Sequence, residues 1–202
     1  MNWRDTVTTI GRTLGQPWTG GLRYVSPGLE ELVFEVADDL SLPRPEVASP
    51  AQPELSFTCR PAQGLLPTSR KTVLLINAEL AQSLSPDELR FGVALTLLTD
   101  RVNSGLAIYP LTVTPILVIY SLHREAWQVA LAVVLVFVTA LLVRGVMILW
   151  ATARARRLVG DITVGRGFLS AIRRFQEGHP DMPPVLVRRF AYLGWTTLFR
   201  GR

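Results

Sequence analysis

The feature that most restricts the fold of this chain is a pair of uncharged, strongly apolar stretches in its second half. Residues 102–122 contain no charged side chain, and residues 126–143 form a second uncharged run after a tip of three polar residues. Arg144 interrupts this run, which then continues without charge to residue 153. A helix of about 20 apolar residues crosses the roughly 30 Å of hydrocarbon in a bilayer. The pattern therefore predicts two transmembrane helices joined as a hairpin.

The alternative is a soluble protein in which both stretches are buried core helices. A chain of 202 residues is too short to enclose two such helices with its other residues, so we favour the membrane. Trp127 and Trp150 lie near the expected interfaces, where aromatic side chains are enriched. Arg144 either reaches the headgroups, if the second span ends beside it, or faces a partner within the membrane. The second option makes Arg144 a candidate partner-binding residue.

Charge is distributed unevenly along the chain. Residues 1–100 carry 8 basic and 12 acidic side chains, whereas residues 101–202 carry 13 basic and 4 acidic ones. A basic half is typical of nucleic-acid-binding proteins, but equally of segments on the cytoplasmic side of a membrane span. The tip carries one arginine, and the outer ends of the spans carry five, namely Arg101, Arg144, Arg154, Arg156 and Arg157. We therefore expect cytoplasmic termini and an external tip, with membrane lipid and other membrane proteins, and not nucleic acid, as partners.

Three parts are expected along the chain, and the first, residues 1–101, is a cytoplasmic mixture of helices and strands. Apolar residues at helical spacing predict a helix over residues 27–40, which a proline-rich loop with at most a short strand follows. Residues 71–77, KTVLLIN, are the strongest strand candidate, and residues 55–58 are a weaker one. Asn77 can cap a short helix after the strand.

The helix that leads into the first span has a clear start signal. Ser85 and Glu88 form a capping box with proline between them, which predicts a helix from residue 86 to about residue 103. Its middle is almost entirely apolar and is expected to be buried.

The second part of the chain is the hairpin of residues 102–153. The third part, residues 154–202, is expected to complete the soluble domain. We expect it to continue the second span as a helix, to bend at its glycines and to end in a helix over residues 185–199.

This order of elements resembles the HtpX-type membrane zinc metallopeptidases, relatives of the CaaX prenyl protease. The resemblance is carried by VLLINAELAQSLSPDEL at residues 73–89 and by a His-Pro turn at His179, and it spans about residues 27–192. It implies a mainly helical, gluzincin-like α+β fold with a small sheet. It also implies that the transmembrane hairpin is inserted between the two helices that bear the metal ligands in active members. The implied location is the bacterial plasma membrane.

The same resemblance implies that the catalytic chemistry is lost. The family's H-E-x-x-H motif falls on Leu95, Thr96 and Thr99, and its E-x-x-x-D motif falls on Arg157 and Asp161. Leucine cannot bind zinc, and a threonine in place of the glutamate has no useful pKa for a general base. We therefore expect no catalytic residue, metal or cofactor, and we expect Arg157 and Asp161 to pair one helical turn apart.

An inactive member would act by contact, as an interaction, scaffolding or accessory subunit of a membrane complex. Substrate peptides of active relatives lie along a sheet edge. The resemblance therefore implies that one strand of this chain is open to strand addition. The alternative is that the strand only fills the core. Its residues are Thr72, Val73, Leu74, Leu75 and Ile76. Other functions stay open: a hydrolase with a relocated serine or threonine site, a regulator of an active membrane peptidase, a transporter element and a nucleic-acid binder.

Three further residues carry reactive side chains. His179 is expected to be a turn residue bonded to the backbone, and His123 lies at the tip, on the other side of the membrane from His179. The two histidines therefore cannot share a metal. Cys59 is expected to pack beside Phe57, since no base for a nucleophilic thiol is evident in the sequence.

Overall fold

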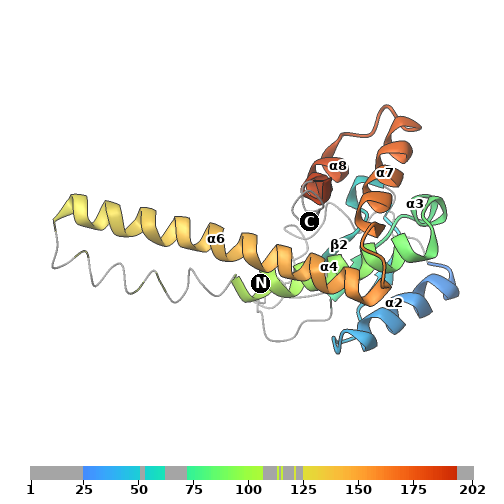
Figure 1. Ribbon diagram of the computed structural model, residues 1–202, viewed down its shortest axis with the longest axis horizontal. Helices are drawn as coiled ribbons and strands as arrows, with labels where there is room; N and C mark the ends of the chain where they lie inside the picture. The colour runs from blue at the N-terminus through green and yellow to red at the C-terminus, as the bar shows by residue number, and fades with distance from the viewer. Residues whose placement is uncertain are drawn as a thin grey trace, which may run out of the picture.

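The computed structural model describes residues 25–50, 53–61, 72–106, 113, 115, 121 and 125–194. They form a mostly helical fold with a small three-stranded sheet and one long apolar helix (Figure 1). The helices and strands, in chain order, are α2 Pro27–Asp39, β1 Glu46–Ala48, β2 Thr58–Pro61, β3 Thr72–Leu75, α3 Ala78–Ser83, α4 Pro86–Leu106, α6 Ala126–Val159, α7 Val164–Glu177 and α8 Val185–Phe190. Short 3-10 turns, η1 Pro53–Leu55 and η2 Ala191–Gly194, complete the described part.

The first predicted span, residues 102–122, lies mostly outside the described residues, so the hairpin stays a prediction. Its first residues belong to α4, which continues to Leu106, slightly further than expected. The second predicted span falls within α6, whose 34 residues correspond to a length of about 51 Å. In Figure 1, α6 lies beside α4 at one end and extends far beyond the other described elements.

Two predicted helix caps are confirmed. The Asn77 side-chain oxygen accepts hydrogen bonds from the backbone amides of Glu79 and Leu80, both at 3.0 Å. The Ser85 hydroxyl accepts from the Glu88 amide at 3.3 Å, and the Glu88 carboxylate accepts from the Ser85 amide at 2.9 Å. These bonds satisfy amides that have no partner within their helices, and they explain why α3 and α4 begin where the sequence predicts.

The sheet corrects two expectations. Residues 53–55 form a 3-10 turn, and the strand predicted at 55–58 begins only at Thr58. The backbone of Phe57 has a φ of 55°, which an extended strand does not allow, and its ring is buried in the core. The predicted strand at 71–77 is β3, and it lies in the middle of the sheet, parallel to β1 and antiparallel to β2. Both of its backbone edges are paired, so it offers no edge for strand addition.

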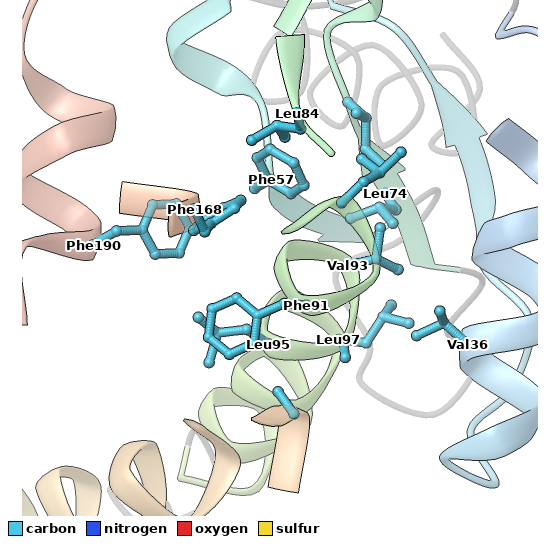
Figure 2. Packing of buried hydrophobic residues seen from close by; sticks show 14 of the residues in the cluster. Val36, Phe57, Leu74, Leu84, Phe91, Val93, Leu95, Leu97, Phe168 and Phe190 are labelled. Carbon is cyan, nitrogen blue, oxygen red and sulfur yellow. The ribbon is translucent and has the colours of Figure 1, made fainter. Parts of the chain in front are cut away.

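The core forms around α4. Figure 2 shows Phe91 and Leu95 on one side of this helix, and Val93 and Leu97 on the other, toward Leu74 of β3 and Val36 of α2. Phe91 packs edge-to-face against Phe168 of α7, with ring centroids 5.7 Å apart. The predicted burial of residues 91–98 is therefore confirmed, and α4 is the central element of the fold.

The end of α6 and the C-terminal helices follow from local signals. Gly160 ends α6 in the left-handed region, with a φ of 76°, which glycine adopts without steric penalty. α7 then packs across α4, in line with the predicted bend at the glycines. The last helix, α8, ends at Phe190 and passes into η2, so it is shorter than predicted within the described residues. Residues 195–199 of the predicted helix lie outside them.

Candidate functional site

The α4 positions that the resemblance equates with zinc ligands are packed into the core. Leu95 is only 1% exposed and lies beside Phe91, on the side of α4 toward α6 and α7 (Figure 2). Thr96 is 7% exposed, and its hydroxyl donates to the Gly92 carbonyl at 2.7 Å. The same hydroxyl lies 3.4 Å from the Phe57 carbonyl. Thr99 is half-buried one turn later. The side chains fill this part of the helix face and leave no open ligand position at Leu95.

Arg157 and Asp161 do not form the pair that their spacing predicts. Asp161 instead accepts hydrogen bonds from the backbone amide of Thr163 at 2.7 Å and from its hydroxyl at 2.8 Å. These bonds hold the pKa of the Asp161 carboxyl below its usual value. The reason for the difference is Gly160, whose left-handed backbone ends α6, so that Asp161 does not follow Arg157 on a continuous helix.

Other α6 residues occupy the surface that faces α4. Ala151 and Ala155 are both completely buried, and Thr152 beside them is 1% exposed. Burial raises the pKa of Tyr192 in η2, and the hydrogen bond of Tyr192 with Thr152 opposes part of that rise. This contact between α6 and the C-terminal turn was not predicted from the sequence. The small residues at 151 and 155, one turn apart, were its only signal.

Arg156 is a second residue whose position sequence reasoning missed. Its guanidinium lies over Gly165 of α7, where an added Cβ atom would come within 3.2 Å of Nη2 and 3.4 Å of the Phe91 ring. Arg156 thus packs where α4, α6 and α7 meet, whereas its neighbour Arg157 is exposed. Sequence position alone did not distinguish the two arginines.

Among the described residues, no group of three His, Cys, Asp or Glu side chains is close enough to hold a metal ion. His179 follows α7, and its Nδ1 lies 2.9 Å from the Phe175 carbonyl while its ring stacks on the Phe175 ring. The predicted structural role of His179 is therefore confirmed. His123 lies outside the described residues. Burial and the nearby Asp100 carboxylate raise the pKa of the Cys59 thiol, which keeps it protonated and a poor nucleophile.

A small pocket lies between the loop after α2 and the last turns of α4. Its volume is about 90 Å³, well below the roughly 300 Å³ of the smallest typical ligand sites. The α4 side chains at its wall are Leu97, Asp100, Arg101 and Ser104. A pocket of this size holds a few water molecules and not an extended peptide.

The largest exposed feature of the described residues is α6 itself. The segment Trp127–Val159 is long and apolar enough to cross a membrane, with a mean hydropathy of 2.6 over its best 18 residues, none of them buried. Trp127 is 62% exposed, and its indole donates to the Glu125 carboxylate at 2.6 Å. At the other end, the Arg154 guanidinium lies 5.6 Å from the centre of the Trp150 ring. Arg144 is exposed between these two ends.

Comparison with known proteins adds nothing to this description. No family model, no curated protein and no solved structure matches the chain. The described residues form a mostly helical structure with a small three-stranded sheet and one helix long and apolar enough to span a membrane.

Proposed function

We propose that this chain is a catalytically inactive relative of the HtpX-type membrane zinc metallopeptidases, with a gluzincin-like fold and a transmembrane hairpin. It acts as an interaction, scaffolding or accessory subunit of a protein complex in the bacterial plasma membrane. The observation that carries the proposal is the packing of Leu95 and Thr96 in the core, at the positions where active relatives hold their first zinc ligand and their general base. Neither side chain can bind zinc or transfer a proton, so a function by contact is left.

The exposed surface of α6 supports the membrane anchor. Large apolar side chains that face outward over most of this helix would be unfavourable in water, whereas lipid accommodates them. They are at least 44% exposed at Leu131, Val133, Val134, Leu135, Phe137, Val138, Leu141, Leu142, Val143, Val146 and Leu149. The order of strand, short helix, capped helix and apolar helix supports the relation to the peptidases.

Metal content and proteolysis test the loss of catalysis. The protein is purified in mild detergent from cells grown with zinc, and its zinc content is measured together with the cleavage of an unfolded substrate. We expect far less than one zinc per chain and no cleavage that a chelator abolishes. One zinc per chain, or chelator-sensitive cleavage, would contradict the proposal. Cleavage that a serine-reactive inhibitor blocks would instead favour the relocated hydrolase.

A second experiment tests the role as a subunit. The tagged full chain is isolated from its native membranes in detergent, and its assembly mass and composition are determined. We expect a complex in which at least one other membrane protein is present in a fixed ratio. A chain that migrates alone in several mild detergents and in lipid nanodiscs would contradict the subunit role. That result would not bear on the membrane anchor.

A further inference from the structure

The position of Arg144 along α6 can be related to the membrane boundaries. Trp127 and Trp150 are 23 residues apart, a distance of about 35 Å along a helix, which fits the hydrocarbon core and its edges. Ala151, the next residue, is completely buried against the folded domain, so the near interface cannot lie much beyond Trp150. Arg144 precedes Trp150 by six residues and therefore lies about 9 Å deeper in the membrane.

The direction of the helix works against a return of this arginine to the near headgroups. In an α-helix every Cα–Cβ bond is inclined toward the N-terminal end. The N-terminal end of α6 is its far end, at Ala126, so the stem of Arg144 starts toward the middle of the bilayer. An arginine side chain that snorkels to the near interface would have to fold back against this inclination.

The chain has no counter-charge for Arg144 at the same depth. It contains no Asp or Glu between Asp100 and Glu125, and none between Glu125 and Asp161. Glu125 is 19 residues before Arg144, about 28 Å along the helix, and already accepts from the Trp127 indole. Charged groups within membranes pair with one another or line polar cavities. A counter-charge for Arg144 at this depth would therefore have to come from another molecule.

We propose that Arg144 is the docking residue for a transmembrane helix of another protein, one that carries an aspartate or glutamate at the same depth. This inference rests on the proposed function, because it needs α6 to span the bilayer. Gly145 adjoins Arg144, and a Cβ atom added to it would meet nothing within 4 Å, so the backbone here is open to close approach. The guanidinium of Arg144 then pairs with the partner carboxylate as a bidentate, desolvated ion pair, which fixes the depth and rotation of the two helices.

The proposal is tested with a defined probe. The full chain is reconstituted into phosphatidylcholine vesicles with a synthetic leucine–alanine transmembrane helix that has one aspartate about 9 Å from an interface. Association is measured by energy transfer between labelled chain and labelled helix, and a helix with asparagine in place of aspartate is the matched control. We expect at least tenfold stronger association with the aspartate helix, lost in Arg144→Leu and only partly kept in Arg144→Lys, which retains the charge but cannot form the bidentate pair. The variant Arg157→Leu, at an exposed arginine outside the span, should associate like the unaltered chain.

Equal association with the aspartate and asparagine helices, or no loss in Arg144→Leu, would overturn the proposal. Equal association is also the result expected if Arg144 binds lipid phosphate. Retention of the unaltered chain in vesicles after alkaline washing reports membrane insertion separately. A chain that washes off contradicts the proposed function, whereas a chain that stays but ignores the aspartate contradicts only the docking role.

A measurement in native membranes uses a photoreactive amino acid at Leu141 or Met147, which flank Arg144 one turn away on each side. We expect the captured segment to be apolar and to contain an aspartate or glutamate, and we expect capture to fall at least fivefold in Arg144→Leu. Capture of a segment without an acidic residue, or capture that is unchanged in this variant, would overturn the inference.

Discussion

Phe57 combines two unusual properties in one residue. Its backbone φ of 55° lies in the left-handed region, which costs a residue with a side chain roughly 1–2 kcal/mol. Its ring is buried edge-to-face against Phe168, with centroids 5.1 Å apart, and its carbonyl accepts from Arg189 Nη1 at 3.3 Å. The buried ring and these contacts offset the strain. Thr96, whose hydroxyl lies near the same carbonyl, is thus part of the packing around Phe57.

A substitution at Thr96 distinguishes a filled core from an open cleft. Thr96→Glu restores the residue type of an active peptidase, but here it places a carboxylate in a buried site. We expect a loss of roughly 3 to 5 kcal/mol in the free energy of unfolding, because a carboxylate larger than the threonine side chain is removed from water in a packed site. Thr99→Glu, at a half-buried position one turn on, is the control and should cost about 1 kcal/mol or less. Unfolding in detergent, followed by circular dichroism, measures both; equal losses would point to an open cleft at Thr96.

The carboxyl of Asp161 gives a pH-dependent prediction. Its pKa is lowered by the Thr163 amide and hydroxyl, so these bonds contribute fully above the ordinary carboxyl pKa and are lost as the pH falls through the lowered value. Thr163→Val removes the hydroxyl and should raise the pKa of Asp161 toward the usual 3.9 or so, whereas Thr163→Ser should keep it low. Carbon-13 shifts of the labelled carboxyl, followed against pH, measure the value. An unchanged pKa in Thr163→Val would mean that the amide alone sets it.

At the scale of secondary-structure elements, α4 determines the architecture. One side of it packs on α2 and the sheet, where Arg90 also pairs with Glu35, and the other side packs on α6 and α7. The close approach of α7 depends on Gly92. A Cβ atom there would come within 2.5 Å of the Phe168 ring and 2.8 Å of the Phe57 ring. A helix centred on such a contact must keep a residue without a side chain at this position.

Gly92→Ala should therefore destabilise the domain although alanine favours helices. We expect a loss of about 1 to 3 kcal/mol, since two packed aromatic rings must shift to make room. Gly28→Ala in α2 is the matched control, because a Cβ atom at Gly28 meets nothing within 4 Å. It should be neutral or stabilising by up to about 1 kcal/mol. Unfolding midpoints of the two variants under the same conditions make the comparison, and a stable Gly92→Ala protein would show that α7 is only loosely docked.

At the scale of the whole molecule, α6 is one continuous helix with two different surroundings. Its last turns are part of the domain core, with Ala151 and Ala155 buried, whereas its earlier turns expose apolar side chains over most of their surface. No break or glycine separates the two parts at Trp150, so in the proposed membrane-spanning arrangement the helix axis sets the orientation of the domain. In the proposed topology, the arginines at the domain end would lie at the anionic cytoplasmic surface.

The orientation can be checked with single cysteines in a Cys59→Ser background. We expect Ile162→Cys, just beyond α6, to react with an impermeant maleimide only when the cytoplasmic face is accessible. Glu125→Cys, before α6, should react only from the outside, because the positive-inside rule places the arginine-rich end in the cytoplasm. Labelling of intact and of inverted membrane vesicles gives the comparison. Labelling of both cysteines from the same side would contradict a membrane-spanning α6.

The sequence by itself determined the elements that depend on local chemistry. The uncharged run from residue 126 predicted a long apolar helix, and the Asn77 cap and the capping box at Ser85 predicted where two helices begin. Each of these signals lies within a few residues of its effect, since a side chain bonds to neighbouring amides or makes one segment apolar. The long-range consequences had no such signal.

Only the tertiary structure decided how these elements meet. The central place of β3 depends on β1 and β2, whose sequences carry only weak strand signals. The open edge expected at β3 is therefore occupied, and β1 and β2 are the edge strands of the described sheet. The left-handed turn at Gly160 separates Asp161 from Arg157, and the burial of Leu95 depends on helices far along the chain. These outcomes rest on packing between segments distant in sequence. The free energy of such packing depends on how the side-chain shapes fit together and on the removal of water, and not on the residue pattern within one segment.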